Sequence, residues 1–323
     1  RRPPRSTLSS SSAASDVYKR QHYYNEGRIG NQIVKEPTIM GHEFSAYIVQ
    51  SQGGVNEAQE GSLVAVDPAI PCGKCEQCQK GHPNLCPHVK FCGTPPIAGV
   101  FSEYASMPAI NCFALPEGFS PEEAAMLEPL GVALHSVNLA HLKPGESVAV
   151  LGAGPIGLLI GAVARLAGAS AVYITEPLAY RREFARHFCA NAVFDPGGHS
   201  PVGDILSMTE GRGVDVVFEA AGADETPEQA AELVRPGGRL ILTGIPKDDR
   251  LSFNASNVRQ KGLTIRLVRR MAHTYPTSIR FVSKHLIDVK SLITHRLPLG
   301  DIGKAMDMLS SYHDGVVKAV ITP

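Results

Sequence analysis

Short apolar runs recur through the middle of the chain and alternate with segments typical of helices. Four of these runs have the length of buried strands. Strands that alternate with helices predict a parallel, doubly wound sheet of the α/β class. The expected strands are Val148–Leu151, Ala171–Thr175, Val214–Phe218 and Arg239–Thr243, and the expected helices are Leu158–Leu166 and Thr226–Val234, with a turn at Pro236-Gly237-Gly238.

A glycine-rich turn follows the first expected strand and opens the first expected helix. In this setting a G-x-G-x-x-G motif is the fingerprint of a dinucleotide site. Its glycines let the backbone approach a pyrophosphate, and the helix N-terminus supplies N–H groups and positive potential. We therefore expect a Rossmann domain that binds a nicotinamide dinucleotide through the segment Gly152-Ala-Gly154-Pro155-Ile156-Gly157.

An acid at the end of the second expected strand bears on the choice of cofactor. Glu176 follows Gly154 by 22 positions, where an acid accepts a hydrogen bond from the ribose 2′-hydroxyl of NAD. Its charge would repel the 2′-phosphate of NADP, so NAD is favoured, although nearby arginines could accommodate that phosphate. We interpret Arg181 and Arg182 as a solvated helix face, with Arg181 retained as a candidate cofactor contact.

Four of the seven cysteines are clustered in one glycine- and proline-containing segment. Thiolates are soft ligands, and four of them complete the tetrahedral coordination of Zn²⁺. Such a closed site leaves no position for substrate, so its role would be structural. A disulfide cluster or free thiols are the alternatives. The expected zinc lobe spans residues 72–86, with the ligands Cys72, Cys75, Cys78 and Cys86, whereas Cys92, Cys112 and Cys189 are expected to be small buried residues.

Several motifs in fixed order resemble the zinc-containing medium-chain dehydrogenases, most closely the sorbitol, or polyol, dehydrogenase branch. The order is Gly41-His42-Glu43, the four-cysteine segment, Glu128-Pro129-Leu130 and the glycine fingerprint. The branch is indicated by HYYNEGRIGN at 22–31, FCGTPP at 91–96, EPLGVALH at 128–135 and ITHRLPL at 293–299. The resemblance extends from about His22 to the C-terminus.

This resemblance implies a GroES-like, β-rich catalytic domain over 22–130 and 270–323, and a Rossmann domain over 131–269. It also implies a catalytic zinc held by a cysteine, His42 and Glu43, with Glu128 as a ligand or as the partner of a zinc-bound water. The metal would lower the pKa of a substrate hydroxyl before hydride passes to the nicotinamide. Because neighbouring residues on a strand face opposite ways, His42 and Glu43 can share one metal only at a turn or strand end.

The same resemblance assigns further residues to the pocket and the proton relay. His22 corresponds to the relay histidine of the family. Tyr23, Phe91 and Thr94 correspond to substrate contacts, as does one arginine of the pair Arg269 and Arg270. Each also has a simpler interpretation. Tyr23 and Phe91 could be core packing, Thr94 a turn residue, and the arginines surface charge.

The first 21 residues do not fit the pattern of the rest. They are rich in serine, lack apolar periodicity, and contain no cysteine, since none precedes Cys72 in the chain. The family's C-G-S-D segment, which supplies the zinc cysteine and the relay serine, falls on Val17-Tyr18-Lys19-Arg20. We interpret residues 1–21 either as a disordered tail or as a segment of foreign origin.

Overall composition narrows the function. Lysine plus arginine equals aspartate plus glutamate at 31 each, so no global field attracts nucleic acid or an anionic membrane. Glycines and a proline interrupt the uncharged stretch Ser147–Ala164, which argues against a spanning helix. We expect a cytoplasmic homo-oligomeric NAD-dependent polyol dehydrogenase. The alternatives are another zinc-type alcohol or amino-alcohol dehydrogenase, or a dinucleotide-binding chain with an impaired catalytic zinc.

Overall fold

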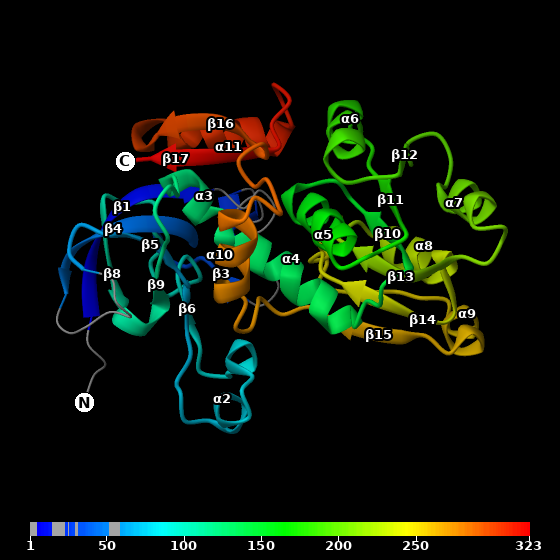
Figure 1. Cartoon of the computed structure of the whole chain (residues 1–323), viewed down its shortest axis with the longest axis horizontal. Helices are drawn as coiled ribbons and strands as arrows, with labels where there is room; N and C mark the ends of the chain where they lie inside the picture. Colours follow the sequence, from blue (N-terminus) through cyan, green and yellow to red (C-terminus); the bar gives the residue numbers. More distant parts are fainter. Residues whose placement is uncertain (1–4, 15–22, 25, 30–31, 52–58) are drawn as a thin grey trace. The chain divides into compact units, whose positions relative to one another are not determined.

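The structure is a computed structural model, and it describes residues 5–14, 23–24, 26–29, 32–51 and 59–323 (Figure 1). These residues belong to two compact units. The first unit comprises 1–131 and 272–323, and the second comprises 132–271. The limits between the two units lie one or two residues from those that the resemblance implied, but the first unit also includes residues 1–21, which were expected to lie outside the catalytic domain.

The first unit is built on a β-sheet that has seven strands among the described residues. Six of them lie in the order β16-β17-β1-β4-β5-β9, and β8 also pairs with β1. The first and last strands of the chain are neighbours, because Ala14 of β1 pairs with Val320 of β17. The strands are β1 (Arg5–Ala14), β4 (Glu43–Ser51), β5 (Leu63–Val66), β8 (Tyr104–Pro108), β9 (Cys112–Ala114), β16 (Ile293–Pro298) and β17 (Lys318–Thr322).

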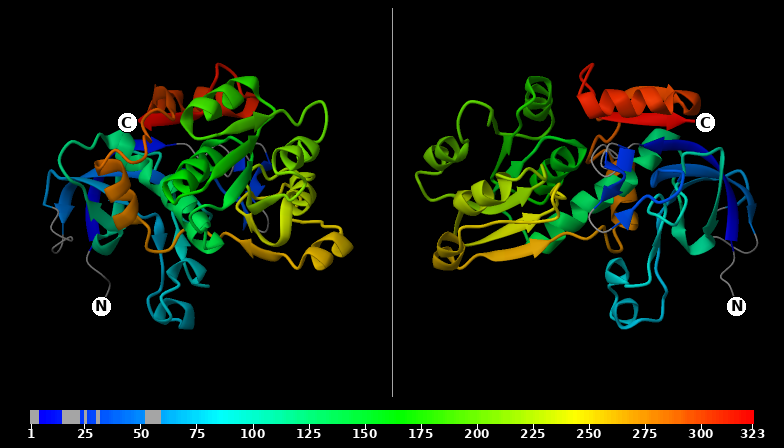
Figure 2. Two further views of the ribbon diagram at one scale, coloured as in Figure 1. Left: turned by 45° about the vertical axis from the view of Figure 1, so that its right-hand side comes forward. Right: turned by 180° about the vertical axis from the view of Figure 1, so that it is seen from behind.

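Shorter elements complete the first unit. The segment from β16 through helix α11 to β17 folds as one group, drawn in red and orange in Figure 2. The remaining elements are β2 (Arg28–Ile29), β3 (Gln32–Ile33), β6 (Ala69–Ile70), β7 (Lys90–Phe91), α2 (Glu76–Gln79), η1 (Pro83–Leu85), η2 (Ala109–Asn111), α3 (Pro121–Ala125), α10 (Tyr275–Ser283), η3 (Leu299–Asp301) and α11 (Ile302–Ser311), and α4 (Leu127–Ala140) begins in this unit.

Strand β1 contradicts the interpretation of the N-terminal segment as a disordered tail. It pairs antiparallel with β4 on one side and with β8 and β17 on the other, and Leu8 is fully buried. A strand paired on both edges satisfies its backbone N–H and C=O groups whatever its side chains are. The serine-rich segment can therefore form an inner strand although its sequence has no apolar alternation. Residues 15–21 lie outside the described residues.

The second unit is a six-stranded parallel sheet in the order β12-β11-β10-β13-β14-β15. The chain leaves the centre in opposite directions from β10 and β13, and at such a switch point doubly wound folds bind their ligands. The elements are β10 (Ser147–Leu151), α5 (Pro155–Leu166), β11 (Ala171–Thr175), α6 (Ala179–Phe188), β12 (Ala192–Phe194), α7 (Val202–Met208), β13 (Val214–Glu219), α8 (Thr226–Leu233), β14 (Val234–Leu242), α9 (Ala255–Lys261) and β15 (Thr264–Leu267).

The helices of the second unit form two packed sets (Figure 1). Helices α5 and α6 contact each other and strands β10 to β12, whereas α8 contacts α7, α9 and strands β13 and β14. Right-handed crossovers on either side of the switch point place such sets on opposite faces of the sheet. No helix in the described part of the chain is long and apolar enough to cross a membrane.

One expected turn takes a different form. The segment Pro236-Gly237-Gly238 was expected to precede a strand, but it lies inside β14. The register explains this, because Val214 pairs with Val234 while Val216 pairs with Arg239. The intervening residues bulge out of the ladder, and Gly237 takes a positive φ of 69°. The two glycines therefore mark an irregularity within the strand and not its start.

Candidate metal centres and cofactor site

The four clustered cysteines converge on one point of the first unit. Each offers a sulfur, and the four sulfurs lie within 4.8 Å of one another. Cys75 caps α2, Cys78 lies inside that helix, and Cys86 ends η1. Four thiolates around one zinc at 2.3 Å would be about 3.8 Å apart. The observed cluster therefore has the size and the donor set of a tetrahedral zinc site.

Backbone N–H groups donate to sulfurs of this cluster and favour a thiolate at Cys72. The amide of Cys75 donates to Cys72 Sγ at 3.3 Å, and the amide of Cys72 donates to Cys86 Sγ at 3.4 Å. Backbone donors, with Lys74 first, lower the pKa of Cys72 to about 6, while desolvation raises the pKa of Cys78 to about 12. All seven cysteines are described, and none forms a disulfide bond, so the disulfide alternative finds no support.

A second cluster gathers residues that are far apart in the sequence. One ligand atom each from His42, Glu43 and Glu128 lie within 4.8 Å of one another, and all three side chains are buried. Glu43 is the first residue of β4, His42 directly precedes it, and Glu128 is in the first turn of α4. A nitrogen and two carboxylate donors match the ligand types of catalytic zinc sites, in which three protein ligands leave a position open.

Close backbone packing holds the segment that presents His42. Gly41 takes a φ of 107° immediately before it. The N–H of Phe101 donates to Met40 O at 2.9 Å, and a Cβ atom at Gly41 would lie only 2.9 Å from that same nitrogen. A Cβ atom at Gly93 would lie 2.7 Å from Gly41 O. Glycine at both positions thus permits the turn that lets His42 and Glu43 face the same point.

A buried lysine pairs with one of the cluster's carboxylates. Lys318, the first residue of β17, donates from Nζ to Glu43 Oε2 at 2.6 Å, and both side chains are 1% exposed. Sequence reasoning missed this residue. The signal available was a lysine opening the apolar strand KAVIT, a position where charge is costly unless it is paired.

Aromatic residues also border the cluster. The Phe91 ring lies 4.9 Å from the His42 ring, centroid to centroid. The Tyr275 hydroxyl donates to Val66 O at 2.7 Å. Burial first, and then the charges of Asp67, Glu128 and Glu43, raise the Tyr275 pKa well above its usual value, so this hydroxyl keeps its proton. Tyr275 was not among the expected site residues.

In the second unit, the glycine fingerprint lies at the carboxyl edge of the sheet. Gly152 follows β10 with a φ of 102°, and a Cβ atom at Gly157 would overlap Gly152 O. Gly154 caps α5, whose first residues are Pro155 and Ile156, and a Cβ atom at Gly154 would meet open space. Gly154 and Ile156 are half-buried at the N-terminus of this largely buried helix, where the motif predicts a bound phosphate.

Glu176 lies beside this turn. Its carboxylate accepts hydrogen bonds from Ala153 N at 2.8 Å and Leu178 N at 3.0 Å, and the side chain is buried. The interpretation of Arg181 and Arg182 as a solvated face is wrong. Arg181 is buried and lies over the Tyr180 ring, while Arg182 forms an ion pair with Asp195 at 2.8 Å.

Comparisons with known proteins show the family of this chain. The family model described as zinc-binding dehydrogenase matches residues 155–284, and the one described as alcohol dehydrogenase GroES-like domain matches residues 7–117. Sorbitol dehydrogenase of Bacillus subtilis is 35% identical over 302 residues, which cover 94% of this chain and 86% of that protein. D-xylulose reductase A of Aspergillus oryzae is 36% identical over 289 residues, covering 88% and 80%.

The chain belongs to the zinc-containing medium-chain dehydrogenases, in their sorbitol dehydrogenase-like branch. Among solved structures, a zinc-binding dehydrogenase of Sinorhizobium meliloti 1021, bound to NADP, has a TM-score of 0.89 at 29% identity and covers 99% of this chain and 92% of its own. This dehydrogenase family uses zinc and a nicotinamide dinucleotide. The GroES-like match begins at residue 7, inside the segment that we interpreted as foreign or disordered.

The structure describes some, but not all, of the remaining residues that the resemblance assigned to the pocket and the proton relay. Tyr23 is buried and donates to Gln32 Oε1 at 3.1 Å, and the Thr94 amide donates to Phe91 O at 3.1 Å. Arg269 and Arg270 belong to the second unit, so their assignment to the substrate pocket stays a prediction. His22 and the segment Val17–Arg20 lie outside the described residues.

Proposed function

We propose that this dehydrogenase oxidises a secondary hydroxyl of a polyol to a ketone, with NAD as hydride acceptor. The observation that carries the proposal is the buried cluster of His42, Glu43 and Glu128 in a chain related to a sorbitol dehydrogenase and a D-xylulose reductase. The names of those relatives supply the substrate class, and the cluster supplies a place for the chemistry.

In this proposal each residue of the cluster has a defined task. A zinc ion held by His42, Glu43 and Glu128 would polarise the substrate hydroxyl and lower its pKa. Lys318 holds the carboxylate of Glu43 in place. Because three protein ligands leave one coordination position open, the substrate has room to approach. The four-cysteine site is closed, so its proposed role is to stabilise the lobe at 72–86.

Turnover tests this assignment. NADH formation would be followed with sorbitol and xylitol, beside a butanediol and threonine, while zinc per chain is measured by mass spectrometry. We expect the highest kcat/KM with a polyol. A higher value with the butanediol or threonine would instead support another zinc-type alcohol or amino-alcohol dehydrogenase, because relative kcat/KM reports differential transition-state binding.

A second candidate is a dinucleotide-binding chain with little or no turnover. The observation that favours it is the absence of any cysteine before Cys72, which leaves the catalytic site without the thiolate of its family. NADH binding without turnover on any alcohol, at saturating zinc, would select this candidate over the first.

The preference for NAD rests on Glu176. Its buried carboxylate stands beside the fingerprint turn, where it would repel a 2′-phosphate. We expect NADH to bind more tightly than NADPH. Glu176→Ala should lower the ratio of the NADPH Kd to the NADH Kd by about tenfold, which corresponds to about 1.4 kcal/mol. Glu183→Ala, which removes an exposed carboxylate on α6, serves as the control and should leave the ratio unchanged. Tighter binding of NADPH by the wild type would contradict the assignment.

A further inference from the structure

A buried carboxyl group stands at the carboxyl end of β13 in the second unit. Glu219 is the last residue of that strand and is fully buried. Its Oε1 accepts hydrogen bonds from Ala221 N at 2.9 Å, Gly222 N at 2.6 Å and Thr226 Oγ1 at 2.8 Å. One side chain therefore fixes the loop after β13 and ties it to the start of α8.

That loop supports the fingerprint turn. The N–H of Ala220 donates to Leu151 O at 2.9 Å, at the end of β10. A Cβ atom at Gly152 would lie 3.0 Å from Ala221 N. The turn that begins the G-x-G-x-x-G motif is thus in backbone contact with the loop that Glu219 holds.

The loop after β14 is attached at the same place. The N–H groups of Thr243 and Gly244 donate to Glu219 O at 2.8 and 3.0 Å. A Cβ atom at Gly244 would overlap the Glu219 carboxylate and lie 2.6 Å from Gly222 N. Three strand-end loops, after β10, β13 and β14, therefore meet around one residue.

We propose that Glu219 is a positioning residue for the nicotinamide dinucleotide, because it sets the shape of the carboxyl edge on which the cofactor is bound. The proposal rests on the cofactor site proposed above, and it concerns a residue that does not itself belong to the fingerprint. Doubly wound sheets bind their ligands at this edge, beside the switch point between β10 and β13. Loops that are preorganised here spare the cofactor the entropic cost of ordering them.

The chemistry of the group fits this role. All the hydrogen-bond partners of Oε1 are donors, and an ionised carboxylate is an acceptor only. Burial raises the pKa of Glu219, whereas the N–H and hydroxyl donors oppose that rise. Glutamine has the same shape, and its carbonyl oxygen can still accept in the place of Oε1. Its NH₂ group cannot accept, so Glu219→Gln would turn the Oε2 side, which faces the backbone of Gly244, from acceptor to donor.

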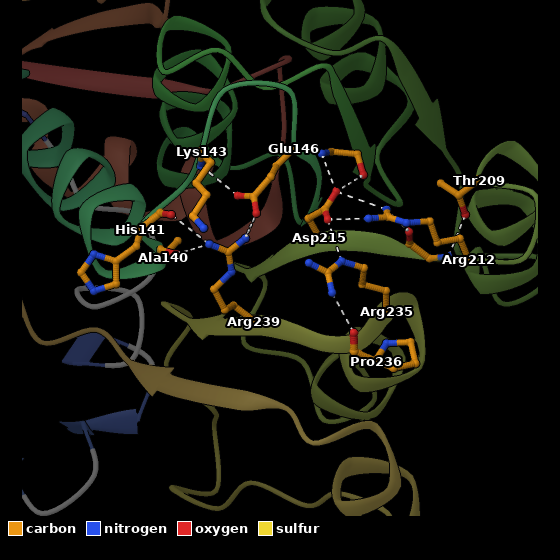
Figure 3. Close-up of polar contacts among 12 residues, drawn as sticks. Ala140, His141, Lys143, Glu146, Thr209, Arg212, Asp215, Arg235, Pro236 and Arg239 are labelled. Carbon is orange, nitrogen blue, oxygen red and sulfur yellow. Dashed lines mark hydrogen bonds and ion pairs between the residues drawn. The ribbon is translucent and has the colours of Figure 1, made fainter.

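The opposite end of the same strand provides a matched control. Asp215, near the amino end of β13 (Figure 3), is also buried. It also accepts from the backbone, since Ser147 N lies 3.0 Å from its Oδ2. It pairs with Arg235 at 2.6 Å and Arg212 at 2.7 Å. Asp215→Asn should therefore lower stability without changing the edge that receives the cofactor.

The experiment compares Glu219→Gln, Thr226→Val and Thr226→Ser with Asp215→Asn in the full chain. NADH affinity is measured by fluorescence titration, and Tm is measured without cofactor. We expect Glu219→Gln to raise the Kd for NADH about tenfold and Thr226→Val about threefold, as for loss of one or two buried hydrogen bonds. Thr226→Ser keeps the hydroxyl and should bind within about twofold of wild type. Asp215→Asn should lower Tm with an unchanged Kd.

Two results would overturn the inference. One is a Glu219→Gln or Thr226→Val variant with a lower Tm that binds NADH as tightly as the wild type. The Glu219 carboxyl would then contribute to stability alone. The other is an equal rise in Kd for Asp215→Asn, which would make the effect a general one. If Glu219→Gln does not fold, the Thr226 pair decides. A wild type that binds no NADH would overturn the proposed function as well.

Discussion

The two candidate metal clusters of the first unit differ in how the chain assembles them. The four cysteines come from one segment, 72–86, and most of them are only partly buried. His42 and Glu43 are adjacent in the chain, whereas Glu128 comes from a distant helix. All three are buried, and Glu43 is paired with Lys318 from the last strand. The first cluster therefore depends on local spacing, and the second depends on the packing of the whole unit.

This difference has an energetic consequence. Little other than the metal can hold four thiolates together in a short loop, so metal binding and folding of the lobe should be coupled. The second cluster already contains a cation, because the ammonium of Lys318 contacts Glu43. Its geometry should persist without zinc, and zinc must compete there with a buried ion pair.

The largest effect is expected where the metal holds the fold. Cys75→Ser should remove one tightly bound zinc, and apparent binding free energies for structural zinc are on the order of 10 kcal/mol. The lobe should lose its protection from proteolysis, and Tm should fall. Metal content by mass spectrometry and limited proteolysis check this outcome. Cys112→Ala, in the apolar core away from the cluster, is the control and should keep the zinc.

The next effect concerns the incomplete set of ligands at the second cluster. Replacing Val17–Arg20 by Cys-Gly-Ser-Asp should add the thiolate and the relay serine of the family, and so raise both zinc content and polyol oxidation. General-base catalysis alone is typically worth about 10²–10⁴-fold, so a rise of at least about 10²-fold in kcat is expected. Ser-Gly-Ser-Asp in the same place lacks the ligand and is the matched control. Rapid turnover by the unaltered chain, with two zincs, would show that another residue completes the site.

Local sequence patterns were sufficient to predict the features that are formed by contiguous residues. The parallel strands, the fingerprint with Gly152 and Gly157, and the four-cysteine lobe all follow from spacing within short segments. The grouping of His42 with Glu128 came only from family resemblance, since no local pattern brings them together. Strand β1 was not predicted because its serine-rich sequence has no apolar periodicity. Backbone pairing with strands on both of its edges holds it in the sheet instead.

Paired charges were the other gap. Lys318 and Glu43 are separated by most of the chain, and neither position indicates the other in a single sequence. The same holds for Glu219, whose partners are the Thr226 hydroxyl and backbone N–H groups of the loops after β13 and β14. Arg181 appeared solvated by composition, yet it is buried. Burial of a charged residue depends on a specific partner, and a partner supplied by tertiary structure leaves no trace in local hydropathy.

The last prediction concerns Lys318, which contacts the second cluster and not the first. In Lys318→Met the carboxylate of Glu43 loses its buried cation, and breaking one side of such a pair costs about 3 kcal/mol or more. With the second cluster empty of metal, the variant should therefore be less stable than the wild type by about that amount. Zinc would then replace the missing positive charge, so its stabilising effect should be larger in the variant than in the wild type.

Thermal unfolding with and without zinc measures this difference, and the four-cysteine site must be kept filled throughout, because its loss would lower Tm for another reason. Lys304→Met is the matched control, since Lys304 is exposed and pairs with Asp301 at the surface, where an ion pair contributes less than about 1 kcal/mol. Equal zinc stabilisation in Lys318→Met and Lys304→Met would mean that Lys318 and the metal do not act on the same carboxylate. The second cluster would then have to bind its zinc through His42 and Glu128, with Glu43 committed to the ion pair.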